Sequence, residues 1–178
     1  TKGREPVDVA GKRTFASPGA PYYPTGNPLV DGVGPAAWAD RSKTPDLNCN
    51  GQNRIVPIGK SSHPVAVHRK DTDPRGLKVI AADGAVAGTV SDLWIDTSDD
   101  CVRYLEVDTG SKKVLAPMAM SVVRKDRVVI DAINASDYAG VPMPVTPGQI
   151  SRYEEERVLA YFGGGYLYAN RGRQEPLI

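Results

Sequence analysis

A chain of 178 residues with 40% hydrophobic and 24% charged side chains has the size and composition of one ordinary globular domain, with or without extensions. Its 22 Lys and Arg against 21 Asp and Glu leave a formal net charge of +1. That balance argues against a nucleic-acid-binding protein, which is usually strongly basic. The two cysteines, Cys49 and Cys101, have no paired spacing, which excludes the common zinc frameworks and a disulfide-dense scaffold and favours reduced cytosolic thiols.

The sequence shows neither a membrane span nor a secretory signal, because no apolar run approaches the ~20 residues that cross a bilayer. Short basic runs occur at 68–70, 112–113, 124–125 and 171–173. Such runs most often form a solvated face. The alternative is contact with an anionic membrane surface, where each Lys or Arg contributes about 1 kcal/mol.

Residues 1–76 contain much of the Pro and Gly and little clean periodicity. The stretch SPGAPYYPTGNPLVDGVGPAAWADR, residues 17–41, has five prolines and four glycines, but it also carries Tyr22, Tyr23 and Trp38. Disordered linkers are poor in such apolar groups. We therefore expect an extended, mostly irregular segment that packs on its own domain or on a partner.

The pattern changes at Gly76, after which short apolar stretches alternate with polar turns. Turn signals stand at Asp83-Gly84, Thr109-Gly110 and Lys125-Asp126. Five or six short strands at intervals of about 8 to 12 residues indicate a small antiparallel barrel or sandwich. Pro117 should close one strand, because proline has no N–H to donate to a ladder.

One helix is predicted near the C-terminus. Thr146-Pro147-Gly148-Gln149 has the pattern of a capping box, and Gly163-Gly164-Gly165 has the pattern of a helix stop, which together predict a helix over 147–162. Glu154, Glu155 and Glu156 should lie on its solvated face. The predicted organisation is therefore an extended segment at 1–76, a barrel at 77–145, the helix and a following segment at 146–169, and a disordered tail at 170–178.

Motifs for bond-making chemistry are missing. The sequence has no G-x-S-x-G, no H-E-x-x-H and no Walker-type loop. His63 and His68 lack the spacing of a helical zinc pair. A calcium-loop pattern at Asp96, Ser98 and Asp100 fails where glycine and glutamate are required, at Cys101 and Val107. We therefore predict no catalytic residues, no metal site and no bound cofactor.

The stretch VSDLWIDTSDDCVRYLEV, residues 90–107, places three aspartates in the connection between two predicted strands. One interpretation is a solvated hairpin tip, which composition alone favours. The other is a proton relay, because carboxylates within about 4 to 6 Å raise each other's pKa. Arg103, across the turn, would keep part of the cluster ionised. A relay is the strongest chemistry that these residues can support.

Three stretches together closely resemble the H subunit of the purple-bacterial photosynthetic reaction centre. They are PTGNPLVDGVGPAAWADR at 24–41, DPRGLKVIAADGAVAGTVSDLWIDTSDDCVRYLEV at 73–107 and EEERVLAYFGGGYLYA at 154–169. The middle stretch, with the strands after it, also resembles a PRC-barrel, a small β-barrel. The resemblance implies a mainly β fold: a small antiparallel PRC-type barrel with an extended Pro/Gly-rich N-terminal segment and one C-terminal α-helix.

The resemblance also implies a role. H subunits are non-catalytic, cap the L and M subunits at the cytoplasmic face of the photosynthetic inner (intracytoplasmic) membrane, shield the quinone sites and help protons reach the secondary quinone. They bind no pigment themselves, since bacteriochlorophyll, bacteriopheophytin, quinones and iron lie in the partner subunits. Carried over to this sequence, the proton-uptake residues would be Asp96 and Asp99, with Arg103 beside them.

Two departures qualify the resemblance. Some members carry a histidine pair at the proton entrance where this chain has Asn50 and Gln52, and Asn48 replaces a nearby acid, so proton donation is not carried over to 48–52. The N-terminal membrane helix of the family is absent, so we expect a soluble fragment with an apolar span upstream of Thr1. An alternative function is a free-standing PRC-barrel adaptor that binds ribosomal protein or RNA, although the near-neutral charge disfavours it.

Overall fold

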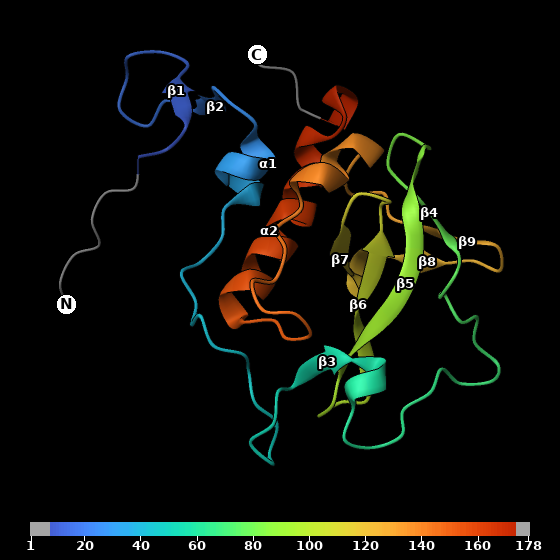
Figure 1. Ribbon diagram of the computed structural model, residues 1–178. Coiled ribbons are helices and arrows are strands. Elements are labelled where there is room, and N and C mark those ends of the chain that lie inside the picture. Colours follow the sequence, from blue (N-terminus) through green and yellow to red (C-terminus); the bar gives the residue numbers. More distant parts are fainter. Residues whose placement is uncertain (1–7, 174–178) are drawn as a thin grey trace.

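The computed structural model describes residues 8–173 and shows a curled main β-sheet with a long helix beside it, and a separate two-stranded sheet of β1 and β2 (Figure 1). The strands are β1 (Gly11–Arg13), β2 (Tyr22–Pro24), β3 (Ile55–Pro57), β4 (Lys78–Ile80), β5 (Val86–Asp96), β6 (Cys101–Asp108), β7 (Lys113–Pro117), β8 (Val122–Val123) and β9 (Arg127–Val129). The helices are α1 (Pro28–Asp31) and α2 (Arg152–Tyr168), with 3-10 turns η1 (Gly34–Ala36), η2 (Ile58–Lys60), η3 (Met118–Met120), η4 (Ala135–Gly140) and η5 (Arg171–Arg173). The predicted fold class is confirmed.

The main sheet has seven strands in the order β7-β6-β5-β4-β9-β8, and β3 pairs with the end of β5. All its pairs are antiparallel except β4 with β9, which run parallel. The predicted strand that closes at Pro117 is present as β7. Short hairpins therefore account for most of the sheet, and one longer connection brings β9 beside β4.

Strand β5 is the longest element of the sheet and carries the hairpin that forms the site described below. Its register with β6 shifts between Val90 and Asp92 and again between Trp94 and Ile95. Such bulges bend a strand and increase its twist, so β5 curls as it runs along the sheet. The last residues of β5 are buried on both faces, down to Asp96.

The N-terminal segment packs on α2 rather than on the sheet itself. Helix α1 and turn η1 contact one side of α2, while β7 contacts α2 as well, so the helix lies between the two (Figure 1). Leu29 and Ala36 are the buried apolar residues of this contact. Strand β3, which belongs to the same stretch of 1–76, instead joins the main sheet, and the sequence pattern did not predict it.

Helix α2 begins five residues later than predicted. Its N-cap is Ser151, whose Oγ accepts a hydrogen bond from the Glu154 backbone N–H at 3.2 Å while the Glu154 side chain accepts one from the Ser151 N–H at 2.7 Å. The predicted cap at Thr146 is wrong, because Gly148 has a φ of +77°, outside the helical region, so 146–149 form a turn. Both stretches fit the capping-box pattern, but only the later one is followed by helical backbone.

The predicted helix stop at Gly163-Gly164-Gly165 is also wrong, because α2 continues to Tyr168. A Cβ at Gly164 would lie 2.5 Å from the Ala36 side chain, and one at Gly165 would lie 2.3 Å from the Ala132 carbonyl oxygen. The glycines therefore serve close packing of α2 against its neighbours, at a cost in helix propensity of about 1 kcal/mol each.

The start of the tail that was predicted to be disordered, 170–178, is ordered. Residues 171–173 form η5, and Arg173 Nη2 donates a hydrogen bond to Asp131 Oδ1 at 2.6 Å. The remainder of that prediction lies outside the described residues. Between residues 8 and 173, no helix has the length and apolar character needed to cross a membrane.

Candidate functional site

The acidic connection between β5 and β6 forms a tight hairpin tip. Strand β5 ends at Asp96 and β6 begins at Cys101, with the two residues paired. Asp100 has a φ of +50°, a left-handed conformation that Asp tolerates better than most residues. Only 1% of the Asp96 surface is exposed, whereas the Asp99 side chain is 52% exposed, so the crowded aspartates occupy different environments.

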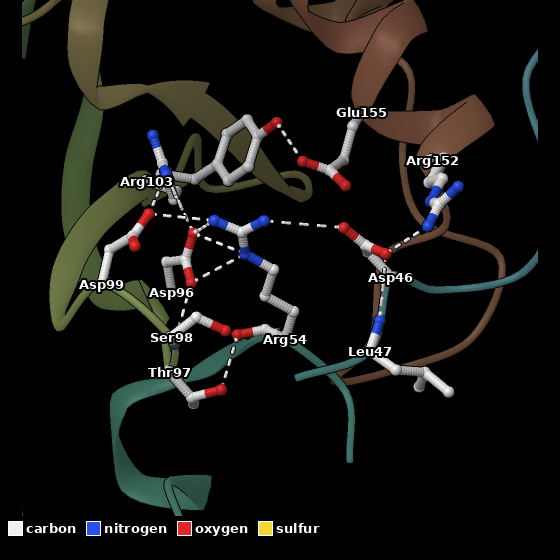
Figure 2. Close-up of polar contacts among 11 residues, drawn as sticks. Asp46, Leu47, Arg54, Asp96, Thr97, Ser98, Asp99, Arg103, Arg152 and Glu155 are labelled. Atoms are coloured by element: carbon white, nitrogen blue, oxygen red, sulfur yellow. Dashed lines mark hydrogen bonds and ion pairs between the residues drawn. The ribbon is translucent and has the colours of Figure 1, made fainter. Parts of the chain in front are cut away.

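Two arginines hold the buried carboxylate of Asp96 (Figure 2). Arg54 Nε donates to both of its oxygens at 2.9 Å, and Arg103 donates to Oδ2 from Nε at 3.0 Å and from Nη2 at 2.9 Å. The backbone N–H of Ser98 adds a further bond to Oδ1 at 2.9 Å. These hydrogen bonds and ion pairs replace the water that the Asp96 carboxylate loses on burial.

The same guanidinium groups also reach Asp99. Arg54 Nη2 lies 2.9 Å from Asp99 Oδ2, and Arg103 Nη2 lies 2.8 Å from the same oxygen. The structure thus brings the three predicted site residues, Asp96, Asp99 and Arg103, into one network. The fourth member, Arg54, comes from the segment before β3, and its guanidinium lies between Asp96 and Asp99 on one side and Asp46 on the other (Figure 2).

The protonation of Asp96 is decided by these contacts. Its burial would raise the pKa, but the hydrogen bonds from Arg54, Ser98 and Arg103 outweigh the burial and lower the pKa to about 2. Asp96 is therefore ionised at every physiological pH. The expectation that the acidic neighbours raise each other's pKa is wrong for this residue, and Asp96 itself does not exchange protons near neutral pH.

The ion pairs continue away from the hairpin tip. Asp46 Oδ2 lies 3.7 Å from Arg54 Nη1, and Asp46 Oδ1 accepts a hydrogen bond from Arg152 at the start of α2. The hydrogen bond from Arg152 lowers the pKa of Asp46. Three arginines and three aspartates therefore alternate across the surface between β6 and α2, and their formal charges sum to zero.

A cavity of about 250 Å³ lies beside this network and extends to α2. Arg54, Asp96 and Arg103 line one side of it, and Tyr104 and Glu155 line the other. The Tyr104 hydroxyl donates a hydrogen bond to Glu155 Oε2 at 3.1 Å. Burial raises the pKa of Glu155, although the hydrogen bond from Tyr104 opposes the shift.

Glu155 is a candidate site residue whose surroundings the sequence pattern did not predict. It was expected on a solvated helix face with Glu154 and Glu156, but Glu154 closes the capping box and Glu156 pairs with Arg41 at 3.5 Å. The i, i+1 positions of a helix point in different directions, so a run of three acids rarely has a single role. With α2 beginning at Arg152, its first turns carry Glu155 to the cavity.

The loop at 48–52 lies next to the hairpin tip. The Asn48 side chain accepts hydrogen bonds from the backbone N–H groups of Asn50 and Gln52, both at 3.0 Å, and donates one to Thr97 Oγ1 at 3.2 Å. Asn48 therefore fixes the loop against the hairpin. None of the three amide side chains titrates near neutral pH.

One histidine does reach the tip, which the sequence did not indicate. His63 Nε2 lies 2.7 Å from Asp100 Oδ1, with the two side chains 42% and 63% exposed. The contact ties the loop after η2 to the hairpin. His68 makes a local contact instead, accepting a hydrogen bond from the Lys70 N–H.

A metal ion is disfavoured at the tip. Among residues 8–173, Asp96, Asp99 and Cys101 are the group whose ligand atoms come close enough to share an ion, within 4.8 Å of one another. Both carboxylates already face the guanidinium groups of Arg54 and Arg103. Two fixed positive charges at the same oxygens oppose a cation, so the arrangement is an ion-pair network.

Comparison with known families first defines the class of the protein. A model of the PRC-barrel domain matches residues 67–136, which contain β4 to β9. The curled sheet and its tight hairpins agree with that match. The chain is thus a PRC-barrel protein, and the hairpin tip with its two aspartates lies inside the matched domain.

A second family model adds the N-terminal part. The N-terminal region of the photosynthetic reaction centre H-chain matches residues 1–60, which include α1, β3 and Arg54. The chain belongs to the reaction-centre H-chain family and carries its PRC-barrel domain. Members of this family are accessory photosynthetic subunits, so the chain belongs with other subunits of a membrane-associated complex.

Proposed function

We propose that this chain caps the L and M subunits of a reaction centre on the cytoplasmic side, shields the quinone sites from bulk water and assists proton uptake to the secondary quinone. The observation that carries the proposal is the single cavity that joins the ionised network of Asp96 to the protonatable Glu155. An ion-pair network next to a partly buried acid has the layout needed to attract a proton and pass it inward.

Each residue contributes differently to this proposed route. Asp99 is exposed and lies at the solvent end, where a carboxylate attracts protons from bulk water. Asp96 stays ionised and holds Arg54 and Arg103 at the lining of the cavity. Glu155 holds a proton to higher pH than an exposed glutamate, because burial raises its pKa. General acid–base groups work best when their pKa approaches the operating pH.

The remaining parts of the proposal concern what this chain does not do. We propose that it is not an enzyme and that bacteriochlorophyll, bacteriopheophytin, quinones and iron belong to L and M. The match to the H-chain N-terminal region favours this role over a free-standing adaptor for ribosomal protein or RNA, which would need the barrel alone. We also propose contact with the cytoplasmic membrane surface.

In the assembled reaction centre, Glu155→Gln should slow proton-coupled reduction of the secondary quinone about tenfold or more, because Gln cannot accept the proton. Primary charge separation should not change. Flash absorption spectroscopy of the second electron transfer measures the effect. Glu156→Gln is the matched control, since Glu156 lies one position further on α2 and pairs with Arg41 outside the cavity. Normal turnover in the Glu155 variant would remove Glu155 from the route.

Replacing both aspartates, Asp96→Asn with Asp99→Asn, should also slow proton-coupled reduction of the secondary quinone and leave primary charge separation unchanged. The network would then hold three guanidinium groups and only the Asp46 carboxylate, and the excess positive charge would repel incoming protons. The rate at several pH values in the assembled complex measures this. If the double variant turned over like the wild type, the hairpin tip would have no part in proton uptake.

A further inference from the structure

A second and larger pocket, of about 400 Å³, lies on the other side of the N-terminal end of α2. Lys43 and Arg157 line it together with Tyr153, and the exposed apolar side chains Met143 and Val145 stand at its rim. It shares no lining residue with the cavity of Glu155. The proposed route for protons therefore gives this pocket no role.

Arg157 is fixed in the pocket by aromatic faces. Its Cζ lies 4.9 Å from the ring centroid of Trp38 and 5.9 Å from that of Tyr153. Its Nε is buried and has no hydrogen-bond partner among the described residues. Buried donors are nearly always satisfied in proteins, so this orphaned Nε marks Arg157 as a residue whose hydrogen-bonding capacity the described residues do not fully use.

Lys43 adds a second positive charge. Its Nζ lies 5.8 Å from the ring centroid of Tyr153, on which Arg157 also rests. The carboxylate that lines the pocket, Glu154, forms no ion pair with either cation among residues 8–173; its oxygens accept hydrogen bonds from the backbone N–H groups of Val145 and Ser151, both at 2.7 Å. The pocket thus presents two cations, of which Arg157 is held between two aromatic rings and Lys43 is exposed.

The chemistry of the lining selects the ligand. The planar guanidinium group matches a carboxylate, which it binds through two parallel hydrogen bonds. Glu154 would repel a doubly charged phosphate more strongly than a singly charged carboxylate. At the rim, Val145 is 88% exposed and Met143 47% exposed, which favours apolar side chains on either side of the acid.

We propose that this pocket binds the carboxylate side chain of an acidic, apolar-flanked segment of a partner protein, with Arg157 and Lys43 as the anchors. Only the identity of the partner, another subunit of the complex, depends on the proposed function. Holding Arg157 in place in advance reduces the entropy lost on binding, which helps a single side chain to anchor a larger interface.

The test is a titration of the whole chain with a blocked peptide, acetyl-Leu-Asp-Leu-amide, against its Asn analogue. Calorimetry gives the affinity. Trp38 fluorescence reports where the peptide binds, since Arg157 lies on the Trp38 ring. The other tryptophan, Trp94, is 4% exposed and donates to Glu106, so its fluorescence should not respond to the peptide. We expect saturable binding of the Asp peptide alone. Arg157→Gln should weaken it about tenfold or more, and Lys43→Gln should weaken it less.

The control is Arg124→Gln, which removes the same charge from the exposed turn between β8 and β9 and should leave binding unchanged. If Arg157→Gln does not melt at the wild-type temperature, the peptide affinity of Lys43→Gln tests the proposal instead, because Lys43 is exposed. Equal binding of both peptides, no saturation up to about 10 mM, or binding of inorganic phosphate or phosphatidylglycerol vesicles instead would overturn the proposal. Because no quinone turnover is measured, neither outcome bears on proton uptake.

Discussion

Asp96→Asn should lower the free energy of unfolding by about 2–3 kcal/mol at pH 7, which is the largest stability loss we expect from any exchange of an acid for its amide in this chain. Removing one partner of a buried ion pair leaves the other charges uncompensated and typically costs about 3–5 kcal/mol. The loss is smaller here because Arg54 and Arg103, 31% and 44% exposed, can recover hydration.

The dependence on pH identifies the cause. The pKa of Asp96 is lowered from 3.8 to about 2 in the folded chain, so its stabilising contribution is complete above about pH 5 and is lost as the pH falls toward 2. That shift corresponds to about 2 kcal/mol. The wild type and Asp96→Asn should therefore approach each other in stability as the pH falls from 5 to 2. Urea unfolding at a series of pH values measures the difference.

Asp99→Asn is the matched control, because Asp99 contacts the same two arginines but is 52% exposed. Exposed ion pairs contribute about 0–1 kcal/mol, so its effect should be small at every pH. Equal stability losses for the two variants, or a difference that persisted unchanged at pH 3, would show that the Asp96 carboxylate does not stabilise the fold through its charge.

The strands of the barrel could be predicted from the sequence, because their signals are local. Each hairpin carries its own turn residues, such as Thr109-Gly110, and Pro117 ends β7 in the way its missing N–H requires. Strand β3 was not predicted. Its three residues, Ile55–Pro57, are too few to show a period, and what makes them a strand is the edge of β5, which is distant in sequence.

The candidate site was also predicted only in part, because some of its contacts join residues that are distant in sequence. Asp96, Asp99 and Arg103 lie within eight positions of one another, so the hairpin that joins them was visible. Arg54 and Glu155 reach the site through β3 and α2, and no local pattern marks either of them. The pKa of Asp96 depends on Arg54, so the protonation of the cluster could not be inferred without the tertiary structure.

The three consecutive glycines of α2 illustrate the difference between local and tertiary signals most clearly. As a local pattern they indicate a helix stop, because glycine disfavours a helix interior by about 1 kcal/mol relative to alanine. In the structure α2 passes through all three, and two of them contact other segments too closely for any side chain. Packing therefore decides the structure against propensity, and alanine substitutions can separate the two effects.

Gly165→Ala should lower the free energy of unfolding by about 2–3 kcal/mol, because its Cβ would lie 2.3 Å from both the Ala132 carbonyl oxygen and the Ile133 Cγ2. Gly164→Ala should also be destabilising, with its Cβ 2.5 Å from that of Ala36. Gly163→Ala should instead stabilise by up to about 1 kcal/mol, since its nearest neighbour, the Pro35 oxygen, is 3.9 Å away.

The sign difference is the decisive result, because the gain in helix propensity is nearly the same at all three positions and cancels in the comparison. Thermal unfolding should show melting temperatures below the wild type for Gly164→Ala and Gly165→Ala and above it for Gly163→Ala, with about 2–4 °C for each kcal/mol in a chain of this size. If all three variants were stabilised, α2 would not pack as closely on Ala36 and Ala132 as the structure shows. If all three were destabilised, the helix would end before Gly163, as the local pattern alone indicates.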